Sequence, residues 1–189
     1  NYNNNIYKLN ENFKPKIILS SYAKSKYKAE KELLDLSKDF KMKILILRLP
    51  LVYGENNKGN IGSLIKLINM RFPFPFKNIN NLRSFLSINN LLLFINTFLS
   101  NNYLKTGVYN IADSRPISTS EFIKKIASKL NKKVIMINMP KILIKLILFL
   151  LGKQPLYQKI FYSQILDISK LKNDFNYDPT MSIDNTDIS

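Results

Sequence analysis

The sequence predicts an α/β protein, because two kinds of apolar pattern alternate along it. Short apolar runs rich in β-branched residues alternate along the chain with longer segments whose apolar residues recur at helical spacing. No internal repeat interrupts this order. Strands that alternate with helices are typical of α/β folds, in which helices pack against a mostly parallel sheet. At 189 residues, 46% of them hydrophobic, the chain is long enough to bury a substantial core.

The first half of the chain passes from a polar start to a helix and a buried strand. Residues 1–20 are polar and rich in asparagine, so we expect a loop there. Ser20 or Ser21 is a suitable N-cap for a helix that should end near Lys41. Residues 42–47 form a short apolar run typical of a strand. A loop over 53–60 and a helix over 61–70 are expected to follow.

The second half begins with an alternation of Phe and Pro over residues 72–76. This segment cannot be helical, because proline lacks an N–H donor and restricts the residue before it to extended backbone. Beyond it we predict strands over 84–87, 108–111 and 134–137. We predict helices over 90–99, from Ser118 or Thr119 to 130, over 141–151 and over 167–174.

The composition excludes several kinds of chemistry. The chain has no cysteine, so disulfides, thiolate metal sites and cysteine nucleophiles are excluded. Histidine is also absent, which excludes serine–histidine catalysis and imidazole-bound metals. We expect no metal site. Acid–base chemistry near neutral pH must therefore come from carboxylates, lysine or tyrosine.

The net charge of +16 suggests a nucleic-acid binder, but the distribution of charge favours another explanation. Only four of the 29 basic residues are arginine, and the lysines are scattered rather than grouped. Asparagine and isoleucine are abundant as well, as A/T-biased coding would produce. We therefore expect no nucleic-acid partner. The alternative, a basic nucleic-acid binder, would lose affinity steeply with salt.

The most apolar stretch, residues 142–151, is too short to cross a bilayer as a helix, which needs about 20 residues. A buried or half-buried helix is the favoured interpretation, and a helix on a membrane surface is the alternative. The N-terminus shows no signal-peptide pattern. We therefore expect a cytoplasmic protein without stable membrane insertion.

One pair of residues is suited to catalysis. Tyr22 and Lys26 are four residues apart in the first predicted helix, so their side chains share a face and can converge. A lysine cation stabilises a tyrosine phenolate, and such a tyrosine can move the proton of a substrate hydroxyl during hydride transfer. The spacing alone is not specific, because Tyr27 and Lys31 repeat it.

The sequence around the pair is more specific. The segment Tyr22-Ala23-Lys24-Ser25-Lys26 is followed, one apolar strand later, by Arg48-Leu49-Pro50-Leu51-Val52-Tyr53-Gly54. This order resembles the extended short-chain dehydrogenase/reductases of the NAD-dependent epimerase/dehydratase family. The Lys58-Gly59-Asn60 segment, the Phe-Pro alternation, Asn81-Leu82-Arg83-Ser84 and the 108–113 and 167–179 segments are similar to its UDP-glucose 4-epimerase-like branch.

The resemblance implies the following roles. Tyr22 would be the catalytic acid/base, and Lys26 would support it and hold the nicotinamide ribose of NAD. Pro50, Leu51 and Val52 would border the nicotinamide. Asn60 and Arg83 would bind the diphosphate of a UDP-sugar, and the segment of Phe74 and Phe76 would hold its uracil. The implied activity is C4 epimerisation or 4-keto reduction of a UDP-hexose or UDP-N-acetylhexosamine.

The resemblance also implies a partial fold. We expect the C-terminal portion of a Rossmann-type doubly wound sheet (1–54 and 84–113) and a small α/β substrate-binding lobe (55–83 and 114–189). The glycine-rich turn that holds the cofactor pyrophosphate in this family is absent, and the family's catalytic Ser/Thr would precede residue 1. We therefore expect an N-terminally truncated chain that is inactive as given. A homodimer is a further expectation.

One departure from the family pattern and two alternative functions remain. Leu51 stands where many relatives that handle UDP- or dTDP-hexoses place Asn, so the sugar stays open. A 3β-hydroxysteroid-dehydrogenase-like or flavonol-reductase-like oxidoreductase would share Tyr22 and Lys26 but would not need Arg83. A non-catalytic remnant is the second alternative.

Overall fold

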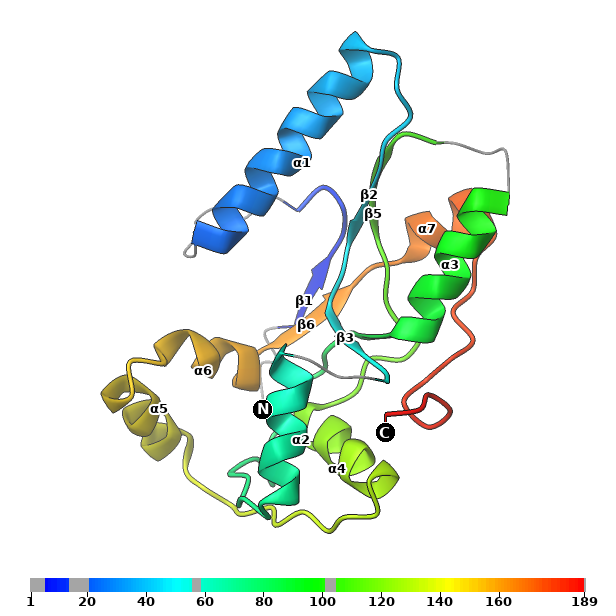
Figure 1. Cartoon of the computed structure of the whole chain (residues 1–189). Coiled ribbons are helices and arrows are strands. Elements are labelled where there is room, and N and C mark those ends of the chain that lie inside the picture. The colour runs from blue at the N-terminus through cyan, green and yellow to red at the C-terminus, as the bar shows by residue number, and fades with distance from the viewer. Residues whose placement is uncertain (1–5, 14–20, 56–58, 101–104, 189) are drawn as a thin grey trace.

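The computed structural model describes residues 6–13, 21–55, 59–100 and 105–188 (Figure 1). The first elements are β1 Ile6–Leu9, α1 Ser21–Asp39, β2 Leu45–Arg48, β3 Leu51–Tyr53, α2 Gly59–Asn69 and β4 Phe85–Ser87. They are followed by α3 Ile88–Ser100, β5 Gly107–Asn110, α4 Thr119–Lys129, α5 Lys141–Leu150, α6 Gln154–Phe161, β6 Ser163–Leu166 and α7 Ser169–Phe175. The predicted α/β class is confirmed.

All three strand pairs among the described residues are parallel. β1 pairs with β6, β2 with β5, and β3 with β4. Parallel partners require a crossover, and Figure 1 shows helices in the connections, with α2 between β3 and β4 and α3 between β4 and β5. This is the pairing that alternation of strands and helices predicts.

Two clusters of buried apolar side chains form the core. The first lies around α2 and α4 and includes Phe74 and Phe122; the second lies around α3, β5 and α7 and includes Phe94. The β3–β4 pair lies between the two clusters. Because neighbouring residues of a strand point to opposite faces, Phe85 packs into the first cluster and Leu86 into the second.

The expected loop over residues 1–20 was wrong for its described part near the start. β1 lies within it and pairs with β6, which sequence reasoning also missed. Neither strand has an apolar run long enough to be recognised. Their position is secured by polar contacts instead, since the Asn110 side-chain amide donates to the carbonyls of Leu9 and Asp167 at 3.0 and 3.2 Å. Residues 14–20 lie outside the described part of the chain.

Three further expectations need correction. The predicted strand over 134–137 is only a bridge between Met136 and Phe74, because it pairs with the proline-interrupted segment, which offers few donors. α6 and β3 were not predicted as separate elements. The favoured interpretation of residues 142–151 as a buried or half-buried helix was also wrong, because α5 packs on α6 through one side and leaves most of its apolar side chains exposed.

Candidate functional site

The predicted catalytic pair lies at the start of α1. Tyr22 is 72% exposed, and the Lys26 ammonium lies 5.7 Å from the centre of its ring. The Ser25 hydroxyl donates to the Tyr22 carbonyl at 2.8 Å, which ties the first turn together. Tyr27 and Lys31 form a similar pair, with the ammonium 5.1 Å from the ring centre, but Tyr27 is half-buried. Exposure therefore distinguishes the Tyr22 pair as the one that a ligand can reach.

An ion pair that the sequence analysis did not assign holds α1 beside β2. The Arg48 guanidinium donates twice to the Glu30 carboxylate, at 2.6 and 3.0 Å, and once to the Glu11 carbonyl at 2.9 Å. Both charged side chains are largely buried, with 27% and 15% exposed. A planar guanidinium suits such a two-point contact, so this pair fixes the orientation of α1 and with it Tyr22. The sequence feature that could have pointed to Arg48 is the scarcity of arginine in this chain.

Pro50 lies in the short connection between β2 and β3, and Leu51 and Val52 lie in β3. Leu51 packs against the first core cluster and Val52 against the second, so these side chains also serve the core. Gly54 follows, and a Cβ at that position would lie 2.1 Å from the Ile88 side chain. Glycine is therefore required where β3 meets the start of α3.

Arg83 is held by its own chain rather than by solvent. Its backbone pairs with Ile117 in both directions, at 3.0 and 3.1 Å. Its guanidinium donates to the Lys159 carbonyl and, at 3.4 Å, to the Gln164 side chain. Burial lowers the pKa of Arg83 from its usual value, because partial removal from solvent disfavours the charged form. Such a cation is suited to an incoming anion.

The segment of Phe74 and Phe76 lies at the edge of a cavity. The Phe74 ring is in the core, 3% exposed, and its backbone pairs with Ile135 and Ile137. The Phe76 ring is half-buried against the same core. Pro75, between them, lines a cavity of about 770 Å³. The Phe74 ring is thus not available to a ligand, whereas Pro75 is.

This cavity is polar and aromatic. Its other lining residues include Asn78, Asn81, Asn138, Tyr157, Phe161 and Lys141. Amides, aromatic rings and cations together can hydrogen-bond, stack and neutralise charge. Asn60, the remaining predicted site residue, is exposed in the first turn of α2, where free backbone N–H groups favour anions.

A buried polar cluster around Asp113 was not predicted. The Asp113 carboxylate accepts hydrogen bonds from Tyr53 Oη at 2.7 Å, Ser87 N at 2.9 Å and Asn90 Nδ2 at 2.7 Å. Burial, the largest effect, raises the pKa of Asp113, although these three hydrogen bonds oppose the rise. Burial likewise raises the pKa of Tyr53, which donates to this carboxylate.

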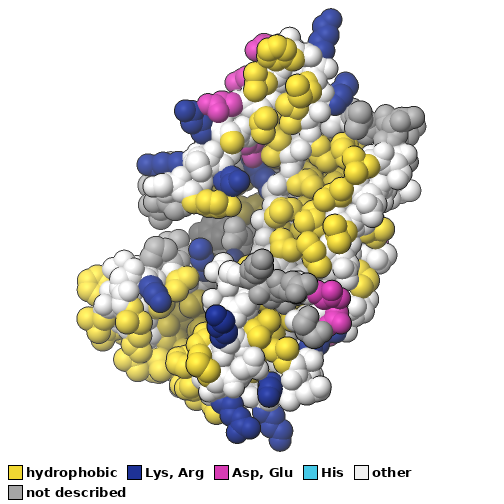
Figure 2. Space-filling model, viewed as in Figure 1, with side chains coloured by type: hydrophobic (Ala, Val, Ile, Leu, Met, Phe, Trp, Pro, Cys, Tyr) yellow, Lys and Arg dark blue, Asp and Glu magenta, His cyan; other side chains and the backbone are white. Residues whose placement is uncertain are grey.

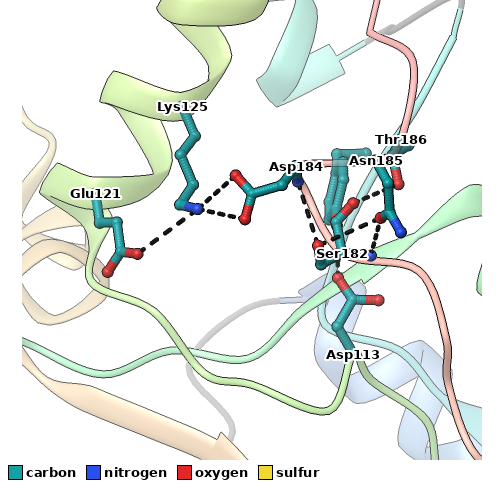
Figure 3. Close-up of polar contacts among 8 residues, drawn as sticks. Asp113, Glu121, Lys125, Ser182, Asp184, Asn185 and Thr186 are labelled. Atoms are coloured by element: carbon teal, nitrogen blue, oxygen red, sulfur yellow. Dashed lines mark hydrogen bonds and ion pairs between the residues drawn. The ribbon is translucent and has the colours of Figure 1, made fainter.

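The C-terminal segment closes over this cluster. Figure 3 shows Lys125 of α4 between Glu121 and Asp184, with the 182–186 turn above Asp113. Lys125 Nζ lies 2.5 Å from Asp184 Oδ1. The Thr186 hydroxyl donates to the Ser87 hydroxyl at 2.8 Å. These contacts join the end of the chain to β4 and α4, so the cluster has a structural role.

Parallel strand pairs and an exposed Tyr-x-x-x-Lys pair on a helix are features that this chain shares with the short-chain dehydrogenase/reductases. The model of the "NAD dependent epimerase/dehydratase family" matches residues 7–112, more than half of the chain. The chain therefore belongs to the NAD-dependent epimerase/dehydratase family.

Individual relatives agree with this assignment. A UDP-glucose 4-epimerase of Vibrio cholerae is 32% identical over 178 residues, covering 94% of this chain and 53% of that protein. An N-acetyl-α-D-glucosaminyl-diphospho-ditrans,octacis-undecaprenol 4-epimerase of Escherichia coli O157:H7 is 27% identical over 121 residues, covering 63% and 37%. The chain thus spans about half the length of the first of these relatives and less of the second.

Solved structures share the fold. A UDP-glucuronic acid 4-epimerase from Bacillus cereus in complex with NAD has a TM-score of 0.70 at 23% identity and covers 98% of this chain and 55% of that one. A UDP-N-acetylglucosamine 4-epimerase from the same organism has a TM-score of 0.70 at 17% identity, with 95% and 56% covered.

Proposed function

We propose that this chain is part of an NAD-dependent enzyme that epimerises a UDP-hexose or UDP-N-acetylhexosamine at C4, or reduces its 4-keto form. The observation that carries the proposal is the exposed pair of Tyr22 and Lys26 at the start of α1 in a member of this family. The 4-epimerase names of its relatives support the reaction. Because the chain matches only about half the length of the first relative, the proposed activity is that of a longer protein that includes this chain.

The proposed chemistry is a proton transfer at the sugar. The Tyr22 phenol oxygen would take the proton of the C4 hydroxyl and later return it, while the Lys26 cation stabilises the phenolate. Bound NAD would accept and return the hydride. The Tyr22 hydroxyl and the Lys26 ammonium are donors in reach of solvent, which fits the nicotinamide-ribose end of that cofactor. Pro50, Leu51 and Val52 would exclude water beside it.

The proposed diphosphate site consists of Asn60 and Arg83. Arg83 supports this because its partly buried guanidinium donates to two neutral groups, the Lys159 carbonyl and the Gln164 side-chain amide oxygen, which a phosphate oxygen can replace with a stronger charge-assisted bond. Pro75 and the aromatic residues of the 770 Å³ cavity would hold the base, with Phe74 and Phe76 supporting the segment from the core side.

The expected division into a Rossmann part (1–54 and 84–113) and a substrate lobe (55–83 and 114–189) stays a proposal. The two core clusters support it in outline, although Leu171 and Tyr177 of the lobe pack into the second cluster and Tyr53 and Phe85 of the Rossmann part pack into the first. A cytoplasmic location is proposed because cells keep UDP-sugars and NAD there. A homodimer is proposed from family membership.

The test of the catalytic role compares two conservative variants on one helix. Tyr22→Phe in the intact native protein should lower 4-epimerase activity toward UDP-glucose and UDP-N-acetylglucosamine by at least about 100-fold, because the proton carrier is lost. Tyr27→Phe should leave activity near that of the unaltered protein. Equal activity in both variants would show a protein that does not use Tyr22, as expected of a non-catalytic remnant.

The test of the nucleotide site is a binding measurement. Arg83→Gln should weaken UDP binding by about tenfold or more in calorimetry, because a charge-assisted bond to phosphate is lost. Arg71→Gln, which removes the same charge elsewhere, is the control. UDP binding that is absent, or unchanged in Arg83→Gln, would favour a hydroxysteroid-dehydrogenase-like or flavonol-reductase-like enzyme instead.

A second candidate substrate is a sugar diphosphate linked to a polyprenyl lipid. It is favoured by one observation: the cavity includes Lys141, the first residue of the exposed apolar helix α5. The E. coli relative is named for such a substrate. Activity on N-acetylglucosaminyl-diphospho-undecaprenol in detergent, without activity on UDP-sugars, would select this candidate.

A further inference from the structure

Helix α5 presents a broad apolar face to solvent. Its exposed apolar side chains, together with the residue that follows the helix, are 38% to 83% exposed. They are Ile142, Leu143, Leu146, Ile147, Phe149, Leu150 and Leu151. Figure 2 shows this surface as a hydrophobic area at the lower left, where α5 and α6 lie in Figure 1. We call these seven residues the α5 face.

Cations border the α5 face. Ile144 is buried, 4% exposed, and marks the side of α5 that packs on the protein. Lys141 and Lys145, four residues apart, lie on one flank of the helix between this buried side and the α5 face. Lys153 follows the end of the helix, and Lys141 Nζ also lies 5.8 Å from the centre of the Phe161 ring.

We propose that the α5 face docks reversibly on an anionic phospholipid bilayer, with the apolar side chains in the interface and the bordering lysines at the headgroups. An apolar helix face flanked by lysine is the composition of interfacial helices. Long lysine side chains can keep their ammonium groups among the phosphates while the apolar face enters the acyl region.

Charge favours a bilayer over a second copy of the chain. The protein carries a net charge of +16, and two copies joined through this face would bring like-charged lysines together. An anionic surface attracts the same lysines. Among the described residues, no helix has the length and hydropathy to cross a membrane. Ten helical residues span about 15 Å, half of a hydrocarbon core, so α5 would lie in the plane of the surface.

Docking would place the cavity beside the bilayer. Pro140 and Lys141, at the start of α5, and Tyr157 and Phe161, on α6, all line it. α5 packs on α6, so the docking helix and the cavity wall are one unit. This inference does not depend on the proposed reaction, and its test needs no substrate.

The test is vesicle sedimentation of the purified full chain. The probes are vesicles of phosphatidylcholine alone and of phosphatidylcholine mixed with phosphatidylglycerol. The chain should bind the mixed vesicles more tightly, and salt should weaken the binding. Leu146→Glu combined with Leu150→Glu should lower the partition coefficient at least about tenfold, because two charges enter the interface.

Two matched controls separate the face from net charge. Leu92→Glu with Leu99→Glu places the same substitutions on exposed leucines of α3 and should leave binding within about twofold. Lys145→Gln with Lys153→Gln should weaken binding to mixed vesicles, whereas Lys28→Gln with Lys38→Gln on α1 should not. The lysine variants alter only exposed positions, so they test the proposal even if the glutamate variants fold poorly.

Three outcomes would overturn the proposal. The unaltered chain fails to bind either vesicle; the α5 glutamate variant binds as well as the unaltered chain; or vesicle binding is absent while the chain forms dimers that the same variant dissociates in light scattering. The last result would assign the α5 face to self-association.

Discussion

The carboxylate of Asp113 accepts hydrogen bonds that originate in three elements. Tyr53 of β3, Ser87 of β4 and Asn90 of α3 all donate to it. Asn90 in turn bonds to the Met181 backbone in both directions at 2.9 Å, which extends the network to the C-terminal segment. A buried charge of this kind is costly unless fully hydrogen-bonded, so its partners are interdependent.

Replacement of Asp113 should therefore be destabilising. Asp113→Ala leaves three buried donors without an acceptor, and we expect the free energy of unfolding to fall by about 2–4 kcal/mol. Urea denaturation followed by circular dichroism measures this. Asp184→Ala is the control, since that carboxylate is 66% exposed and its loss should cost at most about 1 kcal/mol.

The effect of Asp113 should also depend on pH. Burial raises its pKa above the ordinary 3.8, so the folded chain holds the proton more tightly than the unfolded chain. The stability that this contributes is complete below 3.8 and is lost as pH rises through the raised pKa. The cost of Asp113→Ala should thus be larger in acid than at neutral pH. A cost that grows with rising pH would contradict this direction.

At the scale of residues, the sequence predicted that Tyr22 and Lys26 would lie side by side, but it did not predict the contacts around them. The positions of Tyr22 and Lys26 follow from helical spacing alone, because i and i+4 share a face. The Asp113 cluster joins residues up to 91 positions apart, and no local pattern encodes such contacts. The burial of the Phe74 ring likewise depends on helices that pack on it from elsewhere in the chain.

At the scale of elements, the ion pair between Arg48 and Glu30 orients α1 against β2. Glu30→Gln should remove the charge-assisted contact with Arg48 and lower the free energy of unfolding by about 1–2 kcal/mol. Hydrogen exchange of α1 amides should accelerate more than that of α4. Glu32→Gln removes only an exposed pair with Lys28 and should change stability by less than about 0.5 kcal/mol. Equal effects of the two variants would exclude the orienting role.

The elements that the sequence predicted are those with a local signal. α4 has its N-cap Ser118, which accepts from Glu121 N at 2.9 Å, and its apolar face is buried as its spacing predicts. β1 and β6 have no such signal, since their strands depend on partners distant in the sequence: β1 pairs with β6, and β6 also pairs with the segment around Arg83. The exposure of α5 was missed because an apolar run in the sequence does not indicate whether other side chains pack against it.

At the scale of the whole molecule, the two core clusters are joined through β3 and β4. Each strand sends one face into each cluster, so loss of the strand pair would disrupt the packing of both clusters. The C-terminal segment adds a second link, because Tyr177 packs in the second cluster and Ile183 and Ile188 pack in the first. The described part of the chain should therefore unfold as one cooperative unit.

Leu86→Ala tests that cooperativity. Leu86 is fully buried in the second cluster, and its truncation should lower the free energy of unfolding by about 2–5 kcal/mol. Because the clusters are linked, amides of α4 in the first cluster should exchange faster by the same free energy as amides of α3. Leu92→Ala, at a half-exposed leucine, should cost less than about 1 kcal/mol. Faster exchange in α3 with none in α4 would show that the clusters unfold independently, and that the β3–β4 pair does not couple them.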